Sequence, residues 1–295
     1  MRYLLIIGLL FNVAFGQSLF GVVAGDGGLL QETRNFATAT GITNRSLLTK
    51  VNTFVRNMKD SGWWNDIVSV HPYVGGTSQS VVFNLKDTAT YKLQLINSPT
   101  VNDTGIVLNG STQYARTANT EYYLSEILGN DSLTMIARVN LTAQPNASNG
   151  AGYIVNSISA DGNAALFELL GINNTTNVRQ AFRVRTTTSP LLLPTTSTFN
   201  LNSYNNVGGT YDGSTMRLFL NGTVDATTQA ATGNLATTVL DNAYRYTAHG
   251  VRPASIRGGV NSYMTGTFAF ALVSKRVFTT AQMSTINTWI NNLKN

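Results

Sequence analysis

Few side chains in this 295-residue sequence have the chemistry of a catalytic group or a metal ligand. Cys is absent, and His occurs only twice, as His71 and His249. Disulfides, cysteine nucleophiles and zinc sites built from His and Cys are therefore excluded. No Gly-x-Ser-x-Gly segment is present, so the turn that exposes a hydrolase nucleophile is missing. The counts still allow one Ser–His–Asp triad, but His71 precedes Pro72 at an expected domain junction, which favours a structural role.

Carboxylates are the remaining groups for acid–base chemistry. Glycosidases need two of them about 5–10 Å apart. Sandwich-type glycanases place them on one strand as Glu-x-Asp-x-x-Glu, and no such run occurs here. Glu121 and Glu126 are five residues apart in an expected loop, and Glu168 is alone in an apolar run, where we interpret it as a solvent-facing strand position. We therefore predict that the protein is not an enzyme.

Hard oxygen ligands in turns could hold Ca²⁺. The candidates are Asp161, Asn163, Asp241 and Asn242. Asp-Gly and Asp-Asn pairs more often simply form turns. We therefore predict no cofactor, with Ca²⁺ as the alternative.

The composition favours a large core with a neutral surface. Hydrophobic residues make up 43% of the chain and charged residues 12%, which is about half the usual charged share. The formal net charge of +6 comes from Lys and Arg scattered singly along the chain. Nucleic-acid binding needs a clustered basic surface, so we predict no nucleic-acid partner.

Residues 1–16 form a hydrophobic segment with two interpretations. Met1 and Arg2 precede an apolar run over residues 3–15, and small residues follow before Gln17. This pattern is typical of a secretory signal peptide. The run is shorter than the roughly 20 residues of a membrane-spanning helix. The alternative is a retained arm that docks in an assembly or contacts a membrane through residues 3–15.

Residues 17–72 are predicted to form a helical N-terminal segment. Within residues 29–66, one apolar helix face recurs at the i, i+3, i+4 spacing, and Gly62 provides a helix stop. A second helix over residues 32–40 should end at Gly41, and Trp63 and Trp64 should pack where this hairpin meets the next domain. The apolar face consists of Leu47, Leu48, Val51, Phe54, Val55 and Met58.

Residues 73–295 change to the alternating pattern of strands. Short β-rich runs cover residues 81–85, 91–96, 133–139, 153–156, 164–170, 181–185 and 268–273. The run 133–139 alternates like a half-buried strand. Asp212-Gly213 and Asn221-Gly222 predict tight turns between three antiparallel strands. Many short strands with regular turns indicate a β-sandwich or barrel.

The chain ends in a predicted helix. Thr279 and Gln282 match a capping box. An apolar stripe follows, which should face the sandwich rather than a partner; it consists of Met283, Ile286, Ile290 and Leu293.

Three segments resemble the laminin-G/concanavalin-like jelly roll. They are the meander YDGSTMRLFLNGTV (211–224), the strand DSLTMIARVNL (131–141) and the ending FAFALVSKRVFTTAQMSTINTWI (268–290). In that family a hairpin of this type crosses the sandwich, and a late strand leads into a short helix. The resemblance covers roughly residues 75–290. The expected fold is therefore mainly β: an antiparallel jelly-roll sandwich with a short N-terminal helical segment and a C-terminal helix.

Residues 41–87 resemble the opening of virion-associated proteins from phages that infect Bacteroidetes-type bacteria. The matching pieces are MKDSGWW (58–64), HPYVGGT (71–77) and FNLKD (83–87), and VLNGSTQYA (107–115) is also similar to a strand of those proteins. Those proteins generally lack a signal-like start, so residues 1–20 depart from the pattern. The resemblance implies a structural virion protein (capsid decoration, spike or fibre) among other virion proteins, and a homo-oligomer is compatible with it.

Two functional hypotheses follow. The first is a bacteriophage virion protein whose jelly roll binds host-surface glycans. The alternative is a secreted bacterial carbohydrate-binding module or surface adhesin, which the signal-like start favours. Loop aromatic residues could stack on sugar rings, unless they pack beneath their loops. The candidate ligand-binding residues are Tyr122, Tyr123, Tyr204, Tyr244 and Tyr246.

Overall fold

The computed structural model describes residues 28–118, 132–144, 151–158, 165–174, 177–186, 190–198, 200–230, 233, 235, 246–252 and 262–295. The hydrophobic segment 1–16 lies outside these ranges. The described part begins with a helical hairpin, α2 (Gln31–Thr40) and α3 (Arg45–Asp60). Gly41 and Gly62 have positive φ angles of 72° and 73°, which confirms both predicted helix stops.

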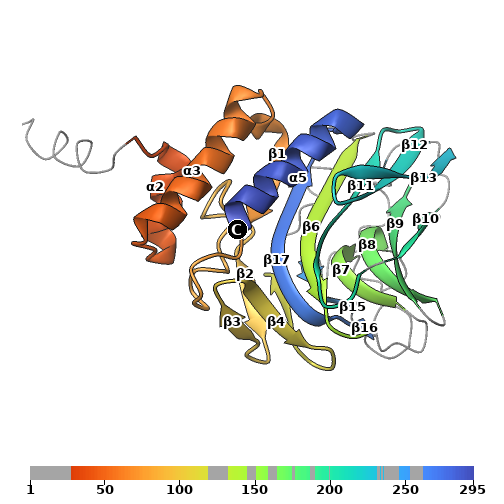
Figure 1. The fold of residues 1–295 in the computed structure, drawn as a ribbon, viewed down its shortest axis with the longest axis horizontal. Helices are drawn as coiled ribbons and strands as arrows, with labels where there is room; N and C mark the ends of the chain where they lie inside the picture. Colours follow the sequence, from red (N-terminus) through yellow and green to blue (C-terminus); the bar gives the residue numbers. More distant parts are fainter. Residues whose placement is uncertain are drawn as a thin grey trace, which may run out of the picture.

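Two antiparallel sheets stack into a sandwich (Figure 1). The eight-stranded sheet contains β1 (Ile67–His71), β3 (Thr100–Asn102), β4 (Gly105–Asn109), β6 (Leu133–Leu141), β11 (Tyr204–Tyr211), β12 (Thr215–Leu220), β13 (Thr223–Ala230) and β17 (Thr265–Ser274). The seven-stranded sheet contains β2 (Leu93–Ile96), β5 (Tyr114–Thr117), β7 (Ala151–Ile158), β8 (Ala165–Asn174), β9 (Asn177–Arg185), β10 (Pro190–Thr198) and β14 (Tyr246–His249). A small pair, β15 (Val251–Arg252) and β16 (Ser262–Tyr263), completes the described strands. The predicted mainly-β sandwich is confirmed.

The predicted meander is present as β11, β12 and β13. Asn221 and Gly222 have φ angles of 51° and 81°, as a two-residue hairpin turn requires. At the other turn only Gly213 has positive φ, at 84°. There the Asp212 carboxylate accepts the amide hydrogens of Ser214 and Thr215 at 3.0 and 2.7 Å, so a side chain closes the turn.

The sandwich core lies between the two sheets. Met135, Val139 and Phe268 from the eight-stranded sheet pack with Leu169 and Phe182 from the seven-stranded sheet. At Gly209 an added Cβ would lie 2.4 Å from the Phe182 ring. A glycine in β11 therefore makes room for a large side chain of the opposite sheet.

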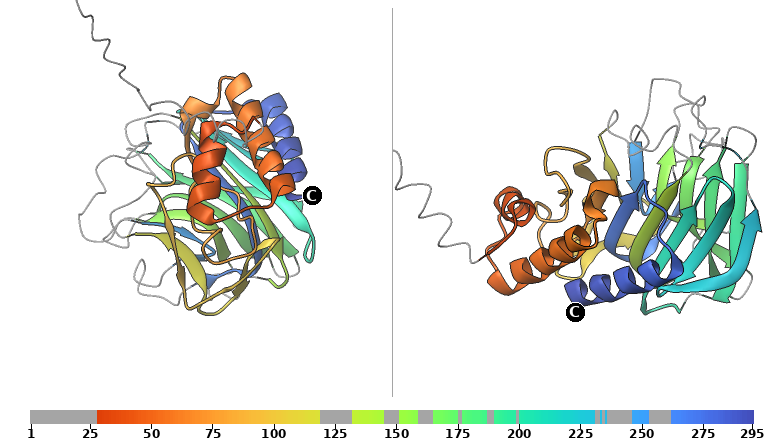
Figure 2. Two further views of the ribbon diagram at one scale, coloured as in Figure 1. Left: turned by 90° about the vertical axis from the view of Figure 1, so that its left-hand side faces the viewer. Right: turned by 90° about the horizontal axis from the view of Figure 1, so that it is seen from above.

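A helical layer covers the outer face of the eight-stranded sheet (Figure 2). The C-terminal helix α5 (Thr280–Lys294) begins with the predicted capping box, and Met283, Ile286, Ile290 and Leu293 are all buried, as predicted. The Phe54 ring of α3 meets the Phe270 ring of β17 edge-on at 5.6 Å. Trp63 and Trp64, beside the short 3₁₀ turn Trp64–Asp66, are buried in the same layer. The predicted junction packing of the two Trp residues is confirmed.

The helical layer corrects the prediction of a half-buried strand over residues 133–139. Ile136 points away from the sandwich core, yet it is only 3% exposed because it packs with the helices. The strand is therefore buried on both faces through most of its length. The alternating strand pattern of residues 133–139 could not reveal this, because the helix that covers the outer face of the strand comes from the far end of the chain.

Two further differences concern strand placement. Residues 81–85 were predicted to form a strand, but they form turns and bends whose side chains, including Val81 and Leu85, fill the core without pairing in a sheet. Conversely, Ile67–His71 lies in the segment predicted to be helical and forms β1, which pairs with β17.

Along the described chain, none of the helices has both the length and the apolar character needed to cross a membrane.

Candidate functional site

The two histidines meet inside the sandwich rather than at its surface. Their ring centroids are 5.5 Å apart, and the side chains are at most 1% exposed. The His71 Nε2–H donates to the Tyr91 carbonyl oxygen at 3.0 Å, and the Tyr73 hydroxyl shares a hydrogen bond with His249 Nδ1. Burial lowers the pKa of His71 to about 4, and burial together with repulsion from His71 lowers the pKa of His249 well below its usual value. Both rings are thus neutral core groups.

Glu168 is not solvent-facing, contrary to the prediction. It is fully buried, and its Oε2 lies 2.7 Å from Nη1 of Arg183, its cross-strand neighbour on β9. Its chain neighbour Leu169 faces the sandwich core, so Glu168 lies on the outer face of the seven-stranded sheet. A buried carboxylate needs a charge partner, and Arg183 supplies it. The arrangement is an ion pair of the sheet rather than an acid poised toward solvent.

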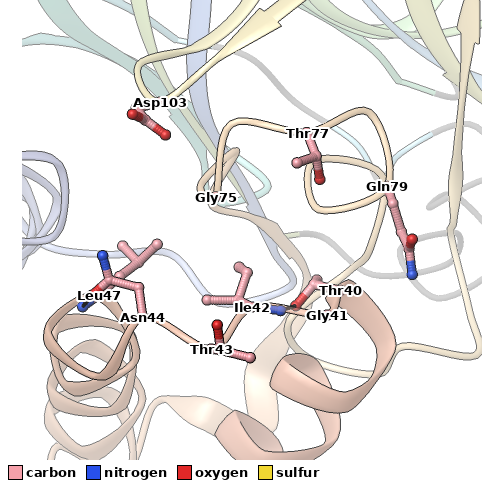
Figure 3. Close-up of a pocket in the computed structure, with 10 residues that line it drawn as sticks. All are labelled: Thr40, Gly41, Ile42, Thr43, Asn44, Leu47, Gly75, Thr77, Gln79 and Asp103. Atoms are coloured by element: carbon pink, nitrogen blue, oxygen red, sulfur yellow. Dashed lines mark hydrogen bonds between the residues drawn. The ribbon is translucent and has the colours of Figure 1, made fainter.

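A pocket of about 440 Å³ opens where the helical hairpin meets the sandwich (Figure 3). One wall is the turn between α2 and α3, and the other comprises the loop after β1 and the turn between β3 and β4. In Figure 3, Asp103 lies across the pocket from Thr43 and Asn44. The lining residues are Thr40, Gly41, Ile42, Thr43, Asn44, Leu47, Gly75, Thr77, Gln79 and Asp103.

Local hydrogen bonds hold the pocket walls. Asn44 caps α3, because its Oδ1 accepts the amide hydrogen of Leu47 at 3.1 Å. Across the pocket, the amide of Thr77 donates to the Ser80 hydroxyl at 3.1 Å, and the amide of Ser80 donates to the Thr77 hydroxyl at 3.0 Å. Gln79 Nε2 donates to the Ala39 carbonyl at 3.1 Å and so ties this loop to α2.

Two glycines allow the walls to approach closely. An added Cβ at Gly75 would lie 2.8 Å from the Ile42 side chain, and one at Gly76 would lie 2.5 Å from Oδ1 of Asp103. Both residues also have positive φ angles, 89° and 66°. Side chains are thus excluded from Gly75 and Gly76 by space and by backbone conformation together.

The pocket has the chemistry of a polar binding site. Its volume falls in the range of ligand pockets, roughly 300–1,000 Å³. Hydroxyl and amide groups of Thr43, Asn44 and Gln79 can exchange hydrogen bonds with a polar ligand, and Ile42 and Leu47 provide apolar contact. Asp103 is the only carboxylate among the described lining residues, whereas glycoside hydrolysis needs a pair.

Of the five candidate tyrosines, the structure describes the surroundings of Tyr204 alone. The Arg138 guanidinium lies over the Tyr204 ring, 4.8 Å from its centroid. Arg138 also donates to Asn206 Oδ1 at 3.2 Å and to Asn291 Oδ1 at 2.5 Å, which links β6 and β11 to α5. Tyr204 therefore borders a polar contact between sheet and helix, far in sequence from the pocket lining.

The side chains of the other predicted ligand positions lie outside what the structure describes. Tyr246 lies in β14 and pairs with Ile158 through the backbone, and the structure describes nothing of its side chain. Tyr122, Tyr123, Tyr244 and the acidic pair Glu121 and Glu126 lie outside the described residues, as do the Ca²⁺ candidates Asp161, Asn163, Asp241 and Asn242. In the described ranges, no group of three or more His, Asp or Glu side chains could hold a metal ion.

Sequence reasoning missed every residue of the pocket as a binding group. Thr, Gly and Asn residues have no characteristic spacing that marks a binding site. Three separate segments of the chain supply them. The Gly75-Gly76-Thr77 run was a usable signal, because adjacent glycines between apolar segments indicate a close backbone approach.

A protein-family model described as the concanavalin A-like lectin/glucanases superfamily matches residues 109–284. The match begins after the last residue of the pocket lining, so the pocket lies in the part of the chain before it. No curated protein sequence matches the chain.

Two solved structures are similar in fold. Trypanosoma rangeli sialidase in complex with a difluoro-KDN ligand is 14% identical with a TM-score of 0.54; the alignment covers 81% of this chain and 39% of that one. The binding domain of botulinum neurotoxin DC in complex with rat synaptotagmin II is 9% identical with a TM-score of 0.51; the coverage is 77% and 52%. The chain thus spans less than two thirds of either protein, and such low identities support a shared fold alone.

Proposed function

Because this chain belongs to the concanavalin A-like lectin/glucanase superfamily, we propose that it is a non-enzymatic glycan-binding protein. We further propose that its sugar site is the pocket between the α2–α3 turn and Asp103. The observation that carries the proposal is the lining of this pocket: neutral hydroxyl and amide groups, one carboxylate and a small apolar wall. These are the groups that exchange hydrogen bonds with sugar hydroxyls and contact the C–H faces of a sugar ring.

The absence of catalysis is part of the proposal. Asp103 has no second carboxylate in the described lining, Glu168 is paired with Arg183, and both histidines are buried. A retaining or inverting mechanism requires two acidic groups flanking the bond. We expect no reducing-sugar release when the full chain is incubated with the glycans that it binds. Release that depends on a carboxylate of this chain would overturn this part of the proposal.

A glycan panel tests the binding site. A subset of immobilised glycans should retain the full chain. Thr43→Val should weaken this binding, because it removes a hydroxyl from the pocket with little change in side-chain volume. Thr53→Val, on the exposed face of α3 and outside this pocket, is the matched control and should leave binding unchanged. Binding that Thr43→Val leaves unchanged would overturn the assignment of the pocket, and no binding to any glycan would overturn the glycan-binding function itself.

We also propose that the protein is a structural component of a bacteriophage particle, as decoration, spike or fibre, and binds host-surface glycans there. The resemblance of residues 41–87 supports this role, and most of the pocket lining belongs to that stretch. Mass spectrometry of purified particles should find the chain in many copies with an intact N-terminus. A chain absent from particles and found in the medium, starting at Gln17, would instead support the secreted carbohydrate-binding module.

A further inference from the structure

The charge of the pocket comes from Asp103. Among the described lining residues it is the only ionisable one, and the remaining groups are hydroxyls, amides, glycines and two apolar side chains. The first turn of α3 also borders the pocket through Thr43, Asn44 and Leu47. A helix N-terminus carries roughly half a positive charge, and here the Asn44 side chain already accepts one of its amide hydrogens. A full carboxylate charge outweighs this partial charge.

A partly buried cation, Lys294, interacts with Asp103 from outside the pocket lining. Lys294 Nζ donates to the carbonyl oxygens of Pro72 and Tyr73 at 3.2 and 2.8 Å, which fixes the ammonium group at the end of α5. Burial and, to a smaller extent, repulsion from Arg138 lower the pKa of Lys294 to about 7, against the opposing attraction to Asp103. Its positive charge near Asp103 is therefore only partial at neutral pH.

The turn between β3 and β4 places the Asp103 carboxylate in the pocket wall. Asn102 Oδ1 accepts the amide hydrogens of Thr104 and Gly105 at 3.0 and 3.2 Å, which closes the turn that carries Asp103. The Asp103 Oδ1 atom occupies the space that a Cβ at Gly76 would take. The carboxylate is thus part of the pocket wall and lies beside Gly76.

We infer that the pocket accepts neutral and amine-bearing sugars and discriminates against acidic ones. This inference rests on the proposed glycan-binding function. A carboxylate can accept hydrogen bonds from two neighbouring sugar hydroxyls or from a sugar ammonium group, whereas it repels the carboxylate of a uronic or sialic acid. Asp103 is exposed, so water screens the repulsion, and we expect a discrimination of about fivefold rather than a thousandfold.

Matched sugars can test the inference. Isothermal titration of the full chain would compare a methyl hexoside, the corresponding 2-amino sugar and the corresponding uronic acid, in the gluco, galacto and manno configurations. In the configuration that binds, affinity should fall from the amino sugar to the neutral sugar to the uronic acid. High salt should reduce the difference, because it screens exposed charges. A uronic acid that binds as tightly as the neutral sugar would overturn the inference.

Asp103→Asn should remove the discrimination, because it keeps the side-chain shape and loses the charge. The uronic acid should then bind about fivefold more tightly than it binds the unaltered chain. Asp60→Asn, at the exposed end of α3 and outside the lining, changes the net charge equally and should leave the order unchanged.

The outcomes separate the two proposals. Binding of no sugar in any configuration overturns the glycan-binding function itself. Binding that Thr43→Val weakens, but whose order Asp103→Asn leaves unchanged, keeps the pocket as the site and overturns the selectivity.

Discussion

The buried histidines make the stability of the fold depend on pH. The folded-state pKa of His71 is about 4 and that of His249 is also lowered, whereas an unfolded His titrates near 6.5. Between these values the unfolded chain binds more protons, so stability is complete above pH 6.5 and is lost as the pH falls toward 4. The His71 imidazole should contribute about 1.4 kcal/mol per pH unit across this window, and protonation of His249 should destabilise the fold in the same direction.

Urea unfolding at a series of pH values would measure this loss. The double variant His71→Gln with His249→Gln should show a much shallower dependence over the same window, since the chain has no other His. An unchanged slope would assign the acid sensitivity to carboxylates instead.

The buried pair of Glu168 and Arg183 provides a second residue-scale prediction. Arg183→Met should lower the free energy of unfolding by about 3 kcal/mol, because it leaves a buried carboxylate without its charge partner. Arg179→Met on the same strand is the matched control and should cost less. Adding Glu168→Gln to Arg183→Met should recover part of the loss. Equal losses of unfolding free energy for Arg183→Met and Arg179→Met would mean that the Glu168–Arg183 ion pair adds no stability of its own.

At the scale of the elements, β11 carries two adjacent glycines with different neighbours. A Cβ at Gly209 would lie 2.4 Å from the rigid Phe182 ring, whereas one at Gly208 would lie 2.8 Å from the flexible end of Met283. Gly209→Ala should therefore cost about 1–3 kcal/mol by overpacking, and Gly208→Ala less. Denaturant midpoints would compare the two, and a larger cost at Gly208 would contradict this account of the sandwich contact.

The first turn of α5 depends on its capping box. The Thr279 side chain accepts the amide hydrogen of Gln282, and the Gln282 side chain accepts the amide hydrogen of Thr279. Thr279→Ala should lower the free energy of unfolding by about 1 kcal/mol, and Thr279→Ser should cost much less. Urea unfolding of the two variants is the measurement, and equal losses would show that the methyl group rather than the hydroxyl matters.

These elements also show which parts of the fold sequence reasoning can predict. The capping box, the helix stops at Gly41 and Gly62 and the Asn221-Gly222 turn were predicted correctly, because each depends on residues within one or two turns. The unpaired run 81–85 was misread, because apolar side chains that fill a core from a loop look like a strand. Ile136 was misread because distant segments cover it, and Glu168 was misread because its partner Arg183 lies on the neighbouring strand.

At the scale of the whole molecule, the eight-stranded sheet joins the helices and the sandwich into one packed unit. Its inner face contributes Met135 and Phe268 to the sandwich core, and its outer face contributes Ile136 and Phe270 to the helical layer. All three Trp residues, Trp63, Trp64 and Trp289, belong to the helical layer. Tryptophan fluorescence should therefore report the helical layer, while far-ultraviolet circular dichroism reports the helices and the strands of both sheets together.

The two signals should give the same denaturation midpoint, because neither layer can separate without exposing the apolar side chains of the shared sheet. Ile286→Ala should shift both midpoints together, with a loss of about 3 kcal/mol. A fluorescence transition that precedes the dichroism transition would show that the helices detach first.

The candidate site could not be predicted from the sequence, because the packing of the whole molecule assembles it. Its walls come from the turn after α2, the loop after β1 and the turn before β4, and only the packing of hairpin on sandwich brings these segments together. Aromatic loop residues were the sequence-based candidates, whereas the described pocket is lined by Thr, Asn, Gln and Gly, two aliphatic side chains and one Asp.

The position of the pocket, before the residues that match the superfamily, has a consequence for protein engineering. Thr43, Thr77 and Gln79 are exposed and contribute no side chain to either hydrophobic cluster. A combinatorial library that randomises Thr43 and Asp103, which is also exposed, and conserves Gly75, Gly76 and the Thr77–Ser80 turn would leave the packing of the scaffold intact. Selection from such a library could then yield new ligand specificities on an unchanged framework.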